Sequence, residues 1–173
     1  PDARFEIVTR DDAEGIRVAL DPMNTLGDRL KIGPRPTEEM PDAVRGHDLS
    51  VMFYAGGEVS ELGRSPTRLA EVLGCGLPVV ANEGVGDVAD IIHRYNVGVI
   101  VKDGSEASMT TALDELEALR SDPDLPSRCR KAAEEVFSLE AGTEAYRKIY
   151  ADILGHTNGS GAAPAVAQAA NDR

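Results

Sequence analysis

Short apolar runs alternate with segments of helical periodicity along most of the chain. The runs at residues 5–9, 30–32, 49–54, 77–81 and 97–101 predict strands. Helices are predicted between them at residues 13–20, 37–45, 65–74 and 88–95, the second capped by Thr37. Strands separated by helices favour parallel pairing through right-handed crossovers. The pattern therefore predicts an α/β fold, with one open, doubly wound, Rossmann-like parallel sheet and helices on both faces.

After the fifth predicted strand the pattern is helical. Three successive apolar stripes predict three helices, and Ser138 is placed to cap the last one. The stripes are Met109, Leu113, Leu116 and Leu119; Cys129, Ala133 and Val136; and Tyr146, Ile149, Tyr150 and Ile153. From residue 155 the chain becomes Gly, Ala, Asn and Ser without a period, which is typical of disorder. We therefore expect a folded domain over residues 1–154 and a disordered tail over residues 155–173.

Composition narrows the range of partners. The 173 residues suit one domain, and 42% of them are hydrophobic. The net charge of −12 argues against a nucleic-acid partner, since phosphate backbones are bound by surplus Lys and Arg. No apolar run reaches membrane-spanning length. Cys75 and Cys129 show no metal or redox spacing, so we interpret them as small buried thiols in a reducing cytosol. His47, His93 and His156 show no metal-ligand spacing either.

Ligands of open parallel sheets bind beyond the carboxyl ends of the strands. This rule directs attention to the loops at residues 33–36, 55–64 and 82–86, and to the helix that begins at Ser65. In that helix Ser65 is a good N-cap and Pro66 a good first helical residue. The free N–H groups of the first turn, together with the helix dipole, favour an anion such as a phosphate.

The predicted helix has two distinct faces. Leu69, Val72 and Leu73 fall on one side, whereas Thr67, Arg68 and Glu71 fall on the other because positions three and four apart share a face. Arg68 could neutralise phosphate oxygens, and Glu71, one turn further in, could accept the hydroxyls of a ribose. The plainer alternative is a solvated helix face with an Arg–Glu pair.

The stretch S-P-T-R-L-A-E-V-L-G-C-G-L-P-V-V-A-N, residues 65–82, resembles the donor-site signature of GT-B glycosyltransferases. It is most similar to the S-P-T-K-L-x-E-x-x-A-x-G-x-P-V-V form of the retaining "glycosyl transferases group 1" family. Residues 30–54, the turn and helix that begin at Gly84, and the helical segment 137–154 also resemble passages of that family in the same order. The resemblance covers about 150 residues and implies the carboxy-terminal, donor-nucleotide lobe of a two-lobe GT-B enzyme.

The resemblance implies a role for several residues. Glu71 matches the glutamate that holds the nucleotide ribose, and Ser65, Pro66 and Thr67 match the turn whose backbone meets the diphosphate. Arg68 stands where many members have Lys. Arg35 lies near the place where the base is usually held, as a weaker candidate. Such donor sites ordinarily need no metal ion and no further cofactor.

Two departures limit what the resemblance implies. Many members carry a further glutamate near the donor sugar, eight positions before the ribose glutamate; here that position is Gly63. Glu58 and Glu61 lie nearby, and either a loop shift brings one of them into place or both are solvated loop acids. The family's first strand, turn and helix of this lobe, with an Arg and a Lys for the diphosphate, and the whole acceptor-binding lobe have no counterpart in these residues. We therefore expect this segment alone to be inactive.

The sequence thus predicts the donor lobe of a retaining, nucleotide-sugar-dependent glycosyltransferase. Its partners would be a UDP or GDP sugar and, through the other lobe, a glycan or lipid-linked acceptor of surface polysaccharide or glycoconjugate synthesis in the cytoplasm. A non-catalytic nucleotide-sugar-binding or interaction module of the same fold is the alternative from another class. A nucleotide-sugar epimerase, which shares the two-lobe architecture, fits the S-P-T-R-L-x-E turn less well.

Overall fold

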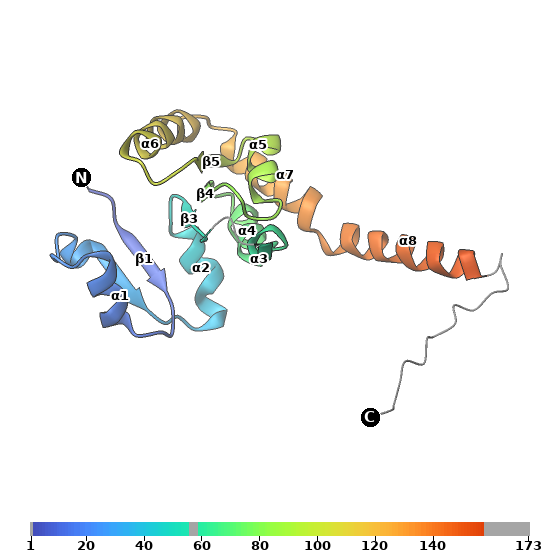
Figure 1. The fold of residues 1–173 in the computed structure, drawn as a ribbon, viewed down its shortest axis with the longest axis horizontal. Coiled ribbons are helices and arrows are strands. Elements are labelled where there is room, and N and C mark those ends of the chain that lie inside the picture. Colours follow the sequence, from blue (N-terminus) through green and yellow to red (C-terminus); the bar gives the residue numbers. More distant parts are fainter. Residues whose placement is uncertain (1, 56–58, 158–173) are drawn as a thin grey trace, which may run out of the picture.

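The computed structural model describes residues 2–55 and 59–157, and it is an α/β structure built on parallel strands (Figure 1). Its five strands lie in two sheets. Strand β1 (Phe5–Val8) pairs with β2 (Leu30–Gly33), and β4 (Val79–Asn82) lies between β3 (Ser50–Met52) and β5 (Gly98–Val101). Every pairing is parallel, as predicted.

In the described residues, the predicted open parallel sheet is present in two parts. Among them, no strand joins the pair β1–β2 to the trio β3–β4–β5. One edge of β1 and one edge of β3 are consequently left without a strand partner in this part of the chain. A contact between the two groups is made instead by side chains: His47, shortly before β3, lies 2.9 Å from Glu6 of β1. The open parallel architecture is confirmed, but it is divided in two.

Three predicted helices lie within two residues of their expected bounds: α1 (Ala13–Leu20), α4 (Thr67–Gly74) and α5 (Val88–Tyr95). Helix α2 (Met40–Arg45) begins three residues later than predicted, and the three predicted apolar stripes fall on α6 (Glu106–Arg120), α7 (Leu125–Phe137) and α8 (Leu139–Thr157). Thr37 does not cap α2, because Thr37–Glu39 forms a separate 3-10 turn before it. A short helix, α3 (Val59–Leu62), occupies a segment predicted to be loop. The predicted tail begins too early, since α8 continues through residue 157; residues 158–173 lie outside the described part.

The core is built around the three-stranded sheet. Its largest fully buried side chains come from α4, α5, α7, β4 and the turns beside them: Leu69, Leu73, Val79, Val85, Val88, Ile92, Val97 and Cys129. Helix α4 packs against α7, and at this contact Gly74 of α4 lies beside Ala133 of α7. The core therefore fixes α4, and with it the predicted ligand helix, firmly against the sheet.

The two cysteines differ in accessibility. Cys129 is fully buried and Cys75 is partly exposed, and neither forms a disulfide. Burial raises the pKa of the Cys129 thiol to about 11. At pH 8 the Cys129 thiol is therefore almost entirely protonated. Because only the thiolate reacts quickly with alkylating reagents, Cys129 is expected to be unreactive in the folded protein.

We expect an alkylating reagent at pH 8 to modify Cys75 in the folded protein and Cys129 only after unfolding. Peptide mass spectrometry with and without urea measures both sites. The matched variants Cys75→Ser and Cys129→Ser should respectively remove and retain the rapid reaction. Rapid native-state labelling of Cys129 would contradict the burial described above.

Helix α8 projects away from the rest of the molecule (Figure 1). Ser138 caps it as predicted, its Oγ accepting a hydrogen bond from the Ala141 N–H at 3.2 Å. The predicted apolar stripe on this helix is exposed: Tyr146, Ile149, Tyr150 and Ile153 are all more than half accessible. Within the described residues, no helix is both long and apolar enough to cross a membrane.

Candidate functional site

The carboxyl ends of β3 and β4 are fastened together by one side chain. The amide of Asn82, the last residue of β4, accepts a hydrogen bond from the Tyr54 N–H at 2.9 Å and donates to the Tyr54 C=O at 3.1 Å. Tyr54 follows β3 by two residues, so its ring lies at the sheet edge where ligands of parallel α/β folds bind. This edge is the first part of the candidate site.

Helix α4 begins beside this edge, at Thr67. Its N-cap is Pro66, and no side chain in the described structure caps it. The prediction that Ser65 caps the helix is therefore wrong. The Ser65 hydroxyl instead lies 3.4 Å from Asp87 Oδ1, in the turn after β4. The first-turn N–H groups that the sequence assigns to an anion consequently have no competing side-chain acceptor from the cap.

The two predicted faces of α4 are confirmed by burial. Leu69, Val72 and Leu73 are at most 2% exposed and pack into the core. Thr67, Arg68 and Glu71 are exposed on the other face. Arg68 and Glu71 are thus free to meet a ligand from solvent, and their roles in binding remain predictions.

Gly86, in the turn after β4, makes the closest backbone approach of the site. Its N–H donates to the Glu61 C=O at 2.9 Å, and its φ of +43° is in the region that favours glycine. A Cβ built on Gly86 would lie 1.8 Å from the Arg64 carbonyl oxygen. The turn after β4 therefore holds the segment that precedes α4 by direct backbone contact.

Glu61 is not a solvated loop acid, as one of the two sequence interpretations held. It belongs to α3, and its side chain is only 9% exposed. Its Oε1 accepts a hydrogen bond from Nη2 of Arg64 at 2.9 Å, while its Oε2 is buried without a hydrogen-bond partner in the described structure. The Arg64 guanidinium lies 5.2 Å from the centroid of the Tyr54 ring. Sequence reasoning missed Arg64 and Tyr54; Arg64's place directly before Ser65 was the available signal.

The remaining loop candidates contribute less to this geometry. Gly63 is exposed, and a Cβ on it would come no closer than 4.0 Å to the Ser60 carbonyl oxygen. The chain therefore has room for a side chain at this position but supplies none. Glu58 lies outside the described residues.

Arg35 lies with the other sheet. Its Nε donates to Glu6 of β1 at 2.9 Å, and the second Glu6 oxygen contacts His47. Burial raises the pKa of the Glu6 carboxyl, but the hydrogen bonds and charges of Arg35 and His47 outweigh it, so the pKa lies below its ordinary value. Arg35 is thus engaged in an ion pair with Glu6, and within the described part of the chain it makes no hydrogen bond or ion pair with residues 65–71.

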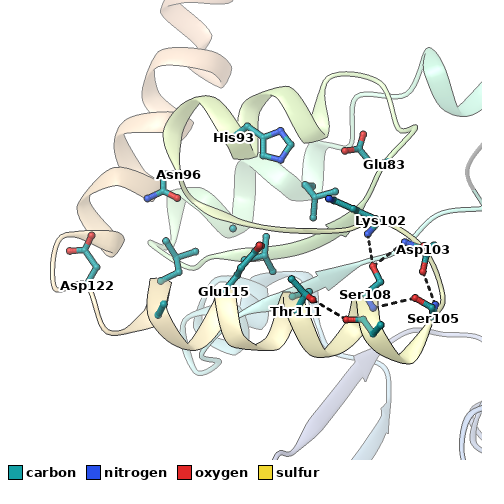
Figure 2. A pocket seen from close by; sticks show the side chains of 17 residues that line it. Glu83, His93, Asn96, Lys102, Asp103, Ser105, Ser108, Thr111, Glu115 and Asp122 are labelled. Carbon is teal, nitrogen blue, oxygen red and sulfur yellow. Dashed lines mark hydrogen bonds between the residues drawn. The ribbon is translucent and has the colours of Figure 1, made fainter.

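A separate open groove of about 870 Å³ runs between α5, β5 and α6 (Figure 2). Figure 2 shows His93 and Glu83 on one side of it and Glu115 and Thr111 of α6 on the other. None of the predicted site residues is among the described residues that line it. At one end, the Ser108 hydroxyl accepts hydrogen bonds from the backbone N–H groups at positions 102 and 103, at 3.1 and 3.3 Å. These N–H groups and the Ser108 hydroxyl are therefore already hydrogen-bonded within the protein.

Among residues 2–55 and 59–157, no group of three or more His, Cys, Asp or Glu side chains is arranged to hold a metal ion. The charged groups near the carboxyl edge include the Glu61–Arg64 pair, Asp87 in the turn after β4, and the exposed Arg68 and Glu71 of α4. This arrangement can offer a polar ligand two guanidinium groups, the N–H groups of the helix start, and a carboxylate that accepts hydrogen bonds from hydroxyl groups.

Comparison with known proteins shows the fold. No family model matches the chain, and no curated protein matches it by sequence. Among solved structures, the chain is similar to sucrose-phosphate synthase from Thermosynechococcus elongatus, with a TM-score of 0.61, 21% identity and 86% of this chain covered. The chain spans 36% of the length of that protein. It therefore shares a Rossmann-like α/β fold with part of that protein.

Proposed function

We propose that this chain forms the donor-binding lobe of a retaining glycosyltransferase that uses a nucleoside diphosphate sugar. The observation that carries the proposal is the start of α4 beside the carboxyl edge of the sheet. There no side chain of the described residues caps its first turn, and Arg68 and Glu71 lie exposed on its outer face. The fold shared with part of sucrose-phosphate synthase supports the same assignment.

The residues would act mainly through electrostatics. The helix start and Arg68 favour negative charge, so they would stabilise the diphosphate as the glycosidic bond breaks and charge develops on its oxygens. Glu71 lies one turn further along the same face, where its carboxylate would accept hydrogen bonds from the two ribose hydroxyls. A UDP or GDP sugar fits these needs, and no metal ion is required by them.

We further propose that other polypeptide completes the enzyme. A strand that pairs in parallel with both β1 and β3 would merge the two described sheets into one. A second lobe would bind the acceptor, a glycan or lipid-linked sugar of surface polysaccharide or glycoconjugate synthesis at the cytoplasmic face of a membrane. The chain's span of 36% of its structural neighbour is compatible with this division.

Nucleotide binding by the full-length protein tests the assignment. Glu71→Ala is expected to weaken UDP or GDP binding about 10- to 100-fold, the loss of a charged hydrogen-bond acceptor, while leaving the affinity for inorganic pyrophosphate unchanged. Arg68→Gln is expected to weaken both. Isothermal titration calorimetry measures each affinity.

Glu117→Ala, an exposed glutamate-to-alanine change on α6, is the matched control and should bind both ligands like the wild type. The proposal is wrong if neither nucleotide binds, or if Glu71→Ala and Glu117→Ala behave alike.

One observation favours the alternative of a non-catalytic binding module. Gly63 offers no side chain where the resembling family has a carboxylate, and Glu61 is already paired with Arg64. Such a module would bind the nucleotide sugar as described but would not transfer it. Incubation of the full-length protein with UDP- and GDP-sugars and a glycan or lipid-linked acceptor separates the two, since only the enzyme releases the nucleoside diphosphate.

A further inference from the structure

We propose that Arg64 is a second diphosphate-binding cation of this site, held at the sheet edge by Tyr54 and Glu61. The inference rests on the proposed function and adds a residue to it. Neither the sequence pattern of residues 65–71 nor the fold likeness assigns any role to Arg64.

The position of the Arg64 side chain is fixed from two sides. Its guanidinium lies over the Tyr54 ring, and its Nη2 donates to Glu61 Oε1 at 2.9 Å. Tyr54 is itself fastened to Asn82 at the end of β4. The cation is thereby placed over the carboxyl ends of β3 and β4, the edge at which ligands of parallel sheets bind.

The backbone of Arg64 is fixed as well. The turn after β4 contacts it so closely that Gly86 has no room for a Cβ beside the Arg64 carbonyl. Ser65, the next residue, contacts Asp87 of the same turn. The Arg64 side chain is held by the Tyr54 ring and by Glu61, and its backbone is held by the turn after β4. It therefore loses little conformational entropy when a ligand binds, which favours binding without rearrangement.

Most hydrogen-bond donors of the Arg64 guanidinium are available to a ligand. A guanidinium carries five N–H groups, and the bond to Glu61 needs one. The side chain is 48% exposed, whereas that of Glu61 is 9% exposed, so the pair presents its cationic member outward. Arg64 also lies three residues before the start of α4, which no described side chain caps, and the guanidinium and the helix start each favour negative charge.

The chemistry of the ligand follows from these features. A fork of N–H donors near a helix start fits a group with several charged oxygens, and a diphosphate offers them across two phosphorus centres. The Arg64 site and the α4 start would then share one diphosphate. A purely structural ion pair would instead leave anion binding unaffected when both of its members lose their charge.

The test removes the whole ion pair. Glu61→Gln/Arg64→Gln leaves the net charge of the protein unchanged and leaves no buried carboxylate unpaired. We expect it to bind inorganic pyrophosphate, UDP and GDP about tenfold more weakly, the loss of one charge-assisted contact, in calorimetry on the full-length protein. The matched control is Glu144→Gln/Arg147→Gln, which removes an exposed pair of the same i, i+3 spacing on α8 and should bind like the wild type.

A second variant guards against a folding defect. Arg64→Lys keeps the charge beside Glu61 but loses the fork, and it should show a smaller loss of pyrophosphate affinity with an unchanged unfolding midpoint. Wild-type affinity in both Arg64 variants, beside a loss in Arg68→Gln, would overturn this inference and leave the proposed function standing. Wild-type nucleotide affinity in both Glu71→Ala and Arg68→Gln would overturn the proposed function instead.

Discussion

Gly86→Ala is expected to lower the free energy of unfolding by at least about 2 kcal/mol and to weaken UDP or GDP binding more than tenfold. The φ of Gly86 is +43°, and a Cβ there would lie 1.8 Å from the Arg64 carbonyl oxygen. Because the obstructing atom belongs to the backbone, no side-chain rotation relieves the clash. The turn must move, and the segment that leads into α4 moves with it.

Urea unfolding and calorimetric titration measure the two effects of Gly86→Ala. Gly104→Ala is the matched control, since a Cβ on Gly104 meets no atom within 4 Å. Equal stability and equal nucleotide affinity in the two variants would show that the close approach at Gly86 is unimportant.

Leu73→Ala is expected to destabilise the protein by about 3 kcal/mol, within the range usual for a buried leucine that leaves a cavity. Leu73 is fully buried on the inner face of α4. Its loss loosens the helix that carries Arg68 and Glu71, so nucleotide affinity should fall as well. The midpoint and slope of urea unfolding measure the change in stability.

Leu113→Ala provides the same chemical change at a residue that is 63% exposed, on α6. It should shift stability by about 0.5 kcal/mol or less. If both leucine variants unfold at the same urea concentration, α4 is not anchored by the core as described.

Local patterns predicted the local structure well. Helix α5 coincides with the predicted range of residues 88–95, because the spacing of Val88, Ile91 and Ile92 reports directly on one buried face. The two faces of α4 were predictable for the same reason. Strand existence followed from apolar runs, and the Rossmann-like α/β class followed from the alternation of strands and helices.

Long-range features escaped prediction. Strand partners depend on which edges meet in space, so the division into two sheets is not written in the apolar runs. The burial of Glu61 depends on α3 and on its pairing with Arg64, and a four-residue helix has too few positions to show a period. Ser65 is a good N-cap by residue type. In the structure, however, its hydroxyl donates a hydrogen bond to Asp87, which is 22 residues away in the sequence and could not be identified from local patterns.

The unpaired edges of β1 and β3 affect the behaviour of residues 2–157 in solution. The β3 edge carries the apolar Val51, 54% exposed, and residues 50–53 contain no proline or charge that would discourage pairing. Edges of this kind are templates for intermolecular strand addition. Residues 2–157 produced alone should therefore self-associate as the protein concentration rises, which light scattering over a concentration series measures.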